Sequence, residues 1–223
     1  MGDNFNLKNW CDTWLKSSGV NILEPVVALN ADGTLQSLKV KQSNGLRGQN
    51  RLHTHKLSIA IYEKAFNKGD QPFVIDNVLV SESDEVTEID TSKIPSDFVV
   101  GAINVNHDEH AYSKVRYDPQ SVEWFKDNLH LVQHPLTRGA IWRSFWILTV
   151  DKKMTSLQYM EFVQKQLVHE DVEQIVAAGL LTLTTLIGNY LPIDVIAEKE
   201  HALFDILVSL LQKEGMIKDP IVD

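Results

Sequence analysis

The sequence has very little cysteine: Cys11 is the one cysteine among 223 residues. A single thiol excludes an internal disulfide and a metal cluster built on several thiolates. The opening residues also lack a basic segment followed by an apolar stretch, which a secretory signal requires. These features predict a cytoplasmic or other reducing intracellular compartment.

Long apolar runs are missing as well. The most apolar stretch, residues 175–191, is interrupted by Thr182, Thr184, Thr185 and Asn189. It therefore falls short of the ~20 apolar residues that a membrane-spanning helix needs. We predict a buried helix here, and no membrane span.

Positive charge is scarce over one long segment. The formal net charge of the chain is -9, and nine acidic residues lie between Asp76 and Glu109 against the single basic residue Lys93. A nucleic-acid partner requires clustered Lys and Arg on one face. The charge pattern therefore disfavours a nucleic-acid partner, and we predict none; it favours a solvated acidic surface around a hairpin.

The common catalytic signatures are absent. A zinc hydrolase of the H-E-x-x-H type needs two imidazoles on one helix face. His169-Glu170 begins that string, but Glu173 stands where the second histidine belongs. The sequence also lacks G-x-S-x-G, G-x-G-x-x-G and a phosphate-cradling glycine loop. We therefore predict no catalytic residue, no metal ligand and no cofactor in this chain.

Two histidine pairs leave an alternative open. His53 and His55 lie two apart on a predicted strand, and His107 and His110 lie in a predicted turn. Either pair could chelate a metal weakly, but the sequence identifies no third ligand. Surface or hydrogen-bonded histidines are the favoured interpretation, and an independent metal enzyme is the least favoured one.

The first half of the chain follows a strand pattern. A short amphipathic helix near residues 5–15 comes first. Apolar residues then alternate from Ile22 on both sides of the Asp32-Gly33 turn, which predicts a hairpin. Further strand candidates are residues 56–62, 73–80, 85–89, 98–105 and 111–117. The pattern predicts an antiparallel β-sandwich of about seven strands.

The second half follows a helical pattern that begins at Asp118-Pro119, an N-cap followed by a proline at the first helical position. Thr155 and Gln158 predict a capping box. The predicted helices lie near 119–130, 135–149, 156–169, 172–190 and 193–214. Short connections predict an antiparallel helical array, giving an α+β multidomain fold. The predicted divisions are residues 1–20 (short helix), 21–117 (sandwich) and 118–223 (helical domain).

The most unusual cluster lies on the second predicted helix. Trp142 and Trp146 are one turn apart, and core packing accounts for the pair. Arg138 lies one turn before Trp142, and Arg143 lies between the two tryptophans. A guanidinium fork suits a carboxylate partner. Arg138 and Arg143 are therefore the candidate contacts to a peptide or to a partner protein.

At these residues the chain resembles the aminopeptidase N family of zinc metallopeptidases, of the bacterial and puromycin-sensitive type. The most specific string is Ala111-Tyr112-Ser113-Lys114-Val115-Arg116-Tyr117-Asp118, which is similar to the family's Y-A-K-V-R-L-D. Other similar strings lie in residues 9–25, 52–57 and 138–146. His53 and Thr54 depart from the arginine and proline usual in the second of these strings.

The resemblance implies a β-sandwich followed by the first helices of a truncated α-superhelix. It also implies that the zinc site belongs to a preceding catalytic domain, which these 223 residues do not include. No catalytic or metal residue can therefore be transferred from the family, and the chain alone is predicted to be inactive.

Two functions follow from the resemblance. The first is a non-catalytic C-terminal portion of an aminopeptidase N-like enzyme, which braces the catalytic domain in cis or in trans and bounds the peptide chamber. The alternative is a truncated paralogue that serves as an adaptor or subunit and binds another protein through exposed apolar helix faces. The first predicts a partner that bears H-E-x-x-H.

Overall fold

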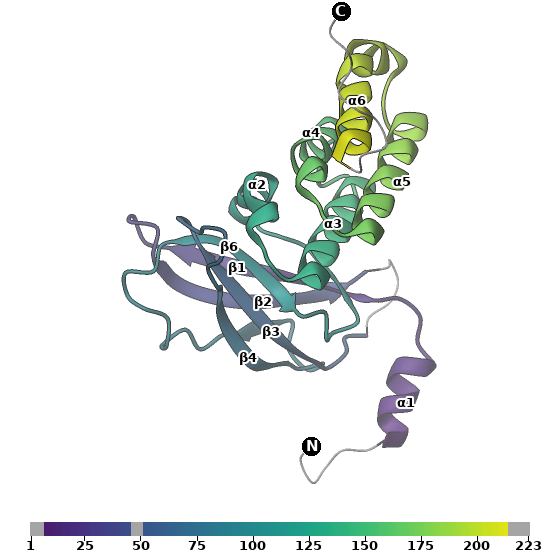
Figure 1. Ribbon diagram of the computed structural model, residues 1–223. Helices are drawn as coiled ribbons and strands as arrows, with labels where there is room; N and C mark the ends of the chain where they lie inside the picture. Colours follow the sequence, from purple (N-terminus) through teal and green to yellow (C-terminus); the bar gives the residue numbers. More distant parts are fainter. Residues whose placement is uncertain (1–6, 46–50, 214–223) are drawn as a thin grey trace, which may run out of the picture. The chain divides into compact units, whose positions relative to one another are not determined.

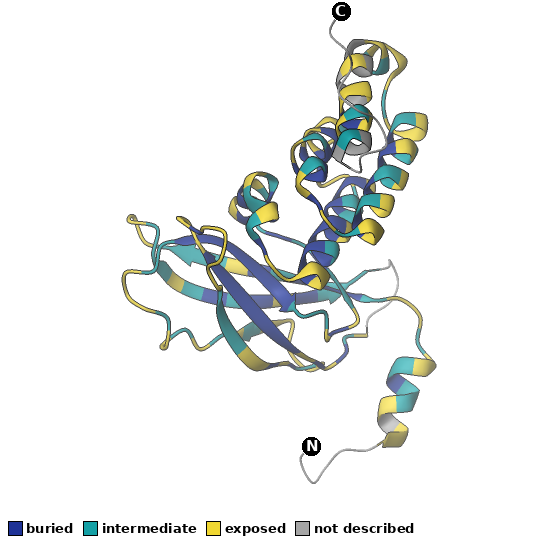
Figure 2. Cartoon of the chain, viewed as in Figure 1, coloured by how far each residue is buried: buried dark blue, intermediate teal, exposed yellow. Residues whose placement is uncertain are grey.

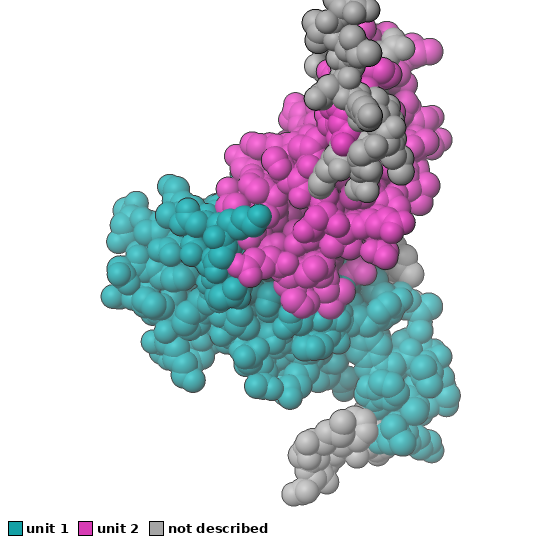
Figure 3. Space-filling view, in the orientation of Figure 1, with its two compact units in different colours: residues 1–124 teal, residues 125–223 magenta. Residues whose placement is uncertain are grey.

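The computed structural model of the protein describes residues 7–45 and 51–213 (Figure 1). The chain divides into two units, residues 1–124 and 125–223 (Figure 3). The division falls inside helix α2 (Pro119–Asn128), whereas the sequence pattern places the change at residue 118. The first half of α2 belongs to the strand-rich unit because the backbone N–H of Ile103 donates to Ser121 Oγ at 2.8 Å.

The first unit contains a short helix and two β-sheets, so its content is mixed. Helix α1 spans Leu7–Leu15. One sheet has the strand order β5-β2-β1-β7 and the other β4-β3-β6. The strands are β1 (Asn21–Leu29), β2 (Leu35–Asn44), β3 (His55–Glu63), β4 (Phe73–Val80), β5 (Val86–Glu88), β6 (Val100–His107) and β7 (Ser113–Val115).

The hairpin predicted at Asp32-Gly33 is confirmed. β1 and β2 pair in antiparallel fashion along their length. In the turn Gly33 has a φ of 85°, a region that glycine enters without a steric penalty. The side chain of Asp32 accepts hydrogen bonds from the backbone N–H of Thr34 at 3.0 Å and from its hydroxyl at 2.7 Å.

One strand pairing corrects the prediction of a fully antiparallel arrangement. β7 lies parallel to β1, with Asn21 opposite Ser113 and Leu23 opposite Val115. Because β2 to β6 intervene between these two strands, no tight turn joins them and dictates an antiparallel pairing. Periodicity within a strand carries no information about the direction of its distant neighbour.

The core of this unit lies on β3 and β6, which Figure 2 colours as almost continuously buried. Ile61 and Val105 are completely buried. Tyr62 packs on Phe66 and Trp124, with ring centroids 5.3 Å apart in both pairs. Burial also raises the pKa of the Tyr62 phenol far above its usual range.

The second unit consists of helices in its described residues. Besides the end of α2, they are α3 (Pro135–Val150), α4 (Ser156–Gln166), α5 (Glu173–Asn189) and α6 (Ile193–Lys213), with single 3-10 turns η1 (Leu129–Leu131) and η2 (Leu167–His169). Its core includes Phe145 and Phe162, whose ring centroids lie 4.5 Å apart. The capping box of Thr155 and Gln158 is confirmed at the start of α4.

Within residues 7–45 and 51–213, no helix combines the length and the apolar character needed to cross a lipid bilayer. The most apolar stretch of the sequence, residues 175–191, is interrupted by polar side chains. It forms most of α5, where the hydroxyls of Thr182, Thr184 and Thr185 each donate to a backbone carbonyl one turn earlier, at 2.9 to 3.0 Å. Ile175, Leu183 and Leu186 are buried inside the helical unit.

Candidate functional site: a clamped helix pair and its pocket

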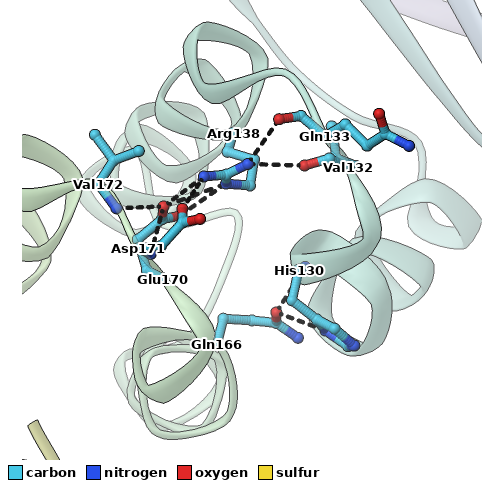
Figure 4. A network of polar contacts seen from close by, with 8 residues as sticks. All are labelled: His130, Val132, Gln133, Arg138, Gln166, Glu170, Asp171 and Val172. Carbon is cyan, nitrogen blue, oxygen red and sulfur yellow. Dashed lines mark hydrogen bonds and ion pairs between the residues drawn. The ribbon is translucent and has the colours of Figure 1, made fainter. Parts of the chain in front are cut away.

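Arg138 lies in the first turn of α3 and is buried, with 7% of its surface exposed. Its Nη1 donates to the backbone carbonyls of Val132 and Gln133 at 3.0 and 2.9 Å. Its Nε and Nη2 donate to the carboxylate of Glu170 at 3.0 and 2.8 Å (Figure 4). The hydrogen bonds to Glu170 raise the pKa of Arg138, so the guanidinium stays charged.

Glu170 joins this arginine to the start of α5. Its Oε1 accepts the backbone N–H groups of Asp171 and Val172 at 3.1 and 3.2 Å. Val172 is the N-cap of α5 and has no capping side chain of its own, so the buried carboxylate supplies an acceptor and a favourable negative charge at that helix terminus. Asp171 adds a second carboxylate 2.6 Å from Arg138 Nη2.

A second set of polar contacts, centred on Gln166, lies near the Arg138 network. The amide oxygen of Gln166 accepts the backbone N–H of His130 at 3.1 Å (Figure 4). The amide nitrogen of Gln166 donates to the carbonyl of Lys126 at 2.7 Å. The rings of His130 and His169 lie 4.7 Å apart. The hydrogen bonds of Arg138 and those of Gln166 together attach the segment around the start of α3 to the segment that joins α4 to α5.

A pocket of about 320 Å³ opens between α3 and α5. α3 contributes a stripe of four residues with helical spacing, α5 contributes the opposite wall, and α4 contributes Tyr159. Its lining residues are Gly139, Trp142, Arg143, Trp146, Tyr159, Gln174, Ile175, Ala178, Gly179 and Thr182. The pocket begins one residue after Arg138, so the contact between Arg138 and Glu170 lies next to it and joins the first turn of α3 to the start of α5.

Aromatic packing shapes the interior of this pocket. Trp142 rests on Phe162 and Trp146 on Tyr159, with ring centroids 4.3 and 5.3 Å apart. The phenol of Tyr159 forms a 2.8 Å hydrogen bond with the hydroxyl of Thr182. Burial raises the pKa of Tyr159 to about 12, so the phenol stays protonated and neutral.

The structure gives the two predicted contact residues different surroundings. Arg138 is buried and bound to Glu170, to Asp171 and to backbone carbonyls. Arg143 is exposed and lines the pocket. Five positions along a helix rotate a side chain by about 140°, which places the two arginines on different faces of α3. The role of either residue in binding a peptide or partner stays a prediction.

The histidine pair of the first unit is buried in a polar cluster around Asn21. The Asn21 side-chain oxygen lies 2.7 Å from His53 Nδ1, 3.2 Å from His55 Nε2 and 3.1 Å from Gln42 Nε2. Trp14 of α1 packs on both imidazoles, with ring centroids 4.3 and 5.5 Å away. In the part of the chain that the structure describes, no group of three or more His, Cys, Asp or Glu side chains is arranged to hold a metal.

The protonation of His55 is controlled by its surroundings. The residue is 2% exposed, and burial, followed by the charge of the neighbouring His53, lowers its pKa to about 4. His55 is therefore neutral at physiological pH. Its hydrogen bond to Asn21 helps to anchor the beginning of β3 next to β1.

Helix α1 has a buried end and an exposed apolar surface. Thr13 is buried, and its carbonyl lies 3.2 Å from His53 Nε2. By contrast Leu7, Trp10 and Leu15 are 61, 44 and 73% exposed. We call these three residues the α1 apolar surface. Contact with another protein surface would remove these apolar side chains from water.

Sequence patterns miss two parts of the site. The local pattern indicates only a polar helix end at Glu170, although this residue is 5% exposed and closes the network around Arg138. Its partner lies 32 positions away, and no local pattern relates the two residues. The pocket is missed as well, because core packing alone accounts for the Trp142 and Trp146 pair. The spacing of Gly139, Trp142, Arg143 and Trp146 is the signal that could have predicted a lining stripe.

Comparison with known proteins points to the aminopeptidases, over a limited part of their length. The chain is 26% identical over 163 residues to Aminopeptidase N of Streptomyces lividans. This alignment covers 71% of the present chain and 19% of that protein, so the chain spans about a fifth of the relative's length. No protein-family model matches the chain.

Proposed function

We propose that this chain is a non-catalytic portion of an aminopeptidase N-like zinc metallopeptidase. Its sheets form the sandwich that braces a peptidase domain, and its helices bound the chamber that holds the peptide. The partial similarity to Aminopeptidase N supports this assignment. The zinc and the catalytic residues are assigned to the peptidase domain, which lies outside these 223 residues.

The α1 apolar surface is the observation that carries the proposal. α1 is attached at its C-terminal end, where Trp14 and Thr13 meet His53. Leu7, Trp10 and Leu15 remain exposed. Burying such side chains contributes roughly 25 cal/mol for each Å² removed from water. A peptidase domain seated on α1 would gain this energy, and Trp10 and Leu15 lie within residues 9–25, one of the strings that resemble the aminopeptidase N family.

In this proposal the helical unit faces the peptide. Arg143 lines the pocket between α3 and α5 and is the proposed contact to a peptide or partner. Arg138 does not contact the peptide in this proposal. Its hydrogen bonds to Glu170 hold the two pocket walls together. We assign Arg138 a positioning role.

A binding experiment tests the α1 interface. The 223-residue chain is mixed with a separately produced peptidase domain of an aminopeptidase N relative, and complex formation is measured by analytical ultracentrifugation. We expect a complex that Trp10→Ser and Leu15→Gln weaken by tenfold or more, since each change removes on the order of 1.5 kcal/mol or more of apolar burial.

The matched control is Leu79→Gln, which alters an exposed leucine on β4. This variant should bind as the unmodified chain does. A complex that tolerates Trp10→Ser and Leu15→Gln equally would contradict the proposed interface. Absence of any complex, together with isolation of the native chain in an assembly that lacks an H-E-x-x-H protein, would overturn the proposed function.

A further inference from the structure

The pocket between α3 and α5 is apolar over most of its wall and carries charge at one place. Trp142, Trp146 and Tyr159 supply three aromatic rings. The Tyr159 phenol already bonds to Thr182 at 2.8 Å, so the ring face is the part that remains for a ligand. An apolar group would therefore be favoured in the interior of the pocket.

Arg143 provides the only formal charge among the lining residues, and the lining contains no Asp or Glu. Arg143 already takes part in an interaction within the chain. A guanidinium nevertheless carries five N–H donors in a fixed fork, more than one partner uses. The electrostatic complement of this pocket is an anion attached to an apolar group.

We infer that this pocket binds the C-terminal residue of a peptide, with a large apolar or aromatic side chain between the Trp142 and Ile175 walls and its terminal carboxylate at Arg143. The inference rests on the proposed function and deepens it by naming the end of the peptide that the helical unit takes. A carboxylate accepts two parallel hydrogen bonds from one guanidinium, and this geometry makes the contact specific as well as strong.

The size of the pocket agrees with this occupant. Its volume of about 320 Å³ lies near the lower limit of the roughly 300 to 1,000 Å³ typical of small-ligand sites. That volume suits one side chain and its carboxylate better than an extended segment. Gly139 widens the pocket at the α3 wall, because a Cβ added there would meet Ile175 at 3.6 Å.

Calorimetric titration of the full 223-residue chain tests the site without any peptidase present. The probes are short peptides that end in phenylalanine with a free carboxylate, the same peptides with a C-terminal amide, and peptides that end in serine. We expect the free acid ending in phenylalanine to bind, and the amide and serine peptides to bind about tenfold more weakly or worse, because a charge-assisted contact or an aromatic contact is lost.

Two pairs of variants locate the binding. Arg143→Met should weaken the free acid by about tenfold while leaving the amide unchanged, and Arg143→Lys should restore part of the loss. Ala178→Phe should fill the pocket and abolish binding. Ala177→Phe is its control: both alanines are exposed on α5, but only Ala178 lines the pocket, so both variants should fold and Ala177→Phe should bind normally.

Equal affinity for acid and amide would overturn the inference, and so would unchanged binding by Ala178→Phe. No detectable binding of the phenylalanine peptide at millimolar concentration would overturn it as well. These outcomes leave the docking of a peptidase domain on α1 untouched, because that interface is measured separately and lies in the other unit. Equally, failure of the α1 experiment with normal peptide binding would overturn the proposed enzyme assembly but not the carboxylate site.

Discussion

Arg138 and Glu170 meet through two guanidinium nitrogens, with Nη2 2.8 Å from Oε1 and Nε 3.0 Å from Oε2. Both side chains are buried, and backbone groups complete their hydrogen bonding. The pair therefore ties the first turn of α3 to the N-terminus of α5. Removing one partner would leave the other as a buried charge without its main counterion, which is much more costly than replacing both.

The first prediction follows from this pair. Arg138→Met should lower the free energy of unfolding by about 3 to 5 kcal/mol, the range for breaking a buried ion pair from one side. Lys165→Met is the control, because the Lys165 and Asp127 side chains are 55 and 61% exposed and such pairs contribute about 0 to 1 kcal/mol. Urea unfolding followed by circular dichroism measures both. Equal destabilisation by the two variants would refute the role given to Arg138.

A related prediction separates stability from peptide binding. Glu170→Gln keeps the shape of the side chain but removes the charge that faces Arg138. We expect it to destabilise the helical unit and to weaken binding of the phenylalanine peptide even at low temperature, where the variant remains folded. Arg143→Met should weaken binding with little change in unfolding, because Arg143 is exposed. If Arg143→Met destabilised the chain as strongly as Glu170→Gln, the assigned roles would be wrong.

His55 makes the stability of the first unit depend on pH. Its pKa is about 4 in the folded chain, against 6.5 for an unperturbed histidine such as that of the unfolded chain. Above pH 6.5 both states hold neutral histidine, and the full stability is present. Between pH 6.5 and 4 the unfolded state binds a proton that the folded state excludes, so stability falls as the pH is lowered, by roughly 3 kcal/mol in total.

The His55 contribution can be isolated by comparing variants. The unfolding free energy is measured by urea titration at several pH values from neutral down to about 4.5, which covers most of the window in which the folded and unfolded states differ in protonation. His55→Gln should flatten the decline between pH 6.5 and 4, whereas His110→Gln, which changes an exposed histidine, should leave it intact. A decline that is equally steep in His55→Gln would mean that other groups cause it.

Local patterns predict much of the secondary structure because their causes are local. The Asp32-Gly33 turn has its own hydrogen bonds within three residues, and the Thr155 capping box closes within one helical turn. The beginning of α3 at Pro135 agrees with the predicted range for the same reason. Each of these features depends on side chains that are neighbours in the sequence.

Long-range relationships cannot be predicted in this way. Asn21, whose side-chain oxygen contacts the rings of His53 and His55, lies 32 and 34 positions before these two residues. The sequence therefore shows a pair of histidines but does not reveal the partner that they share. The parallel pairing of β1 with β7 depends on the path of the chain between the two sheets. For the candidate site, the sequence identifies Arg138 and Arg143 as residue types suited to carboxylates, but it cannot distinguish an internal carboxylate from an external one.

The last prediction concerns Gly101 on β6, near the point where the β3 pairing shifts register. A Cβ built at Gly101 would lie 2.5 Å from Trp124 Nε1 and 2.8 Å from the carbonyl oxygen of Glu63, so Gly101→Ala must displace the indole or the strand. We expect a loss of about 1 to 3 kcal/mol, as for overpacking in other cores. Gly188→Ala, on α5 with no atom within 4 Å of its added Cβ, should instead stabilise by up to about 1 kcal/mol. Thermal unfolding together with Trp fluorescence distinguishes the two, and a Gly101→Ala protein as stable as the parent chain would mean that Trp124 is not held against β6.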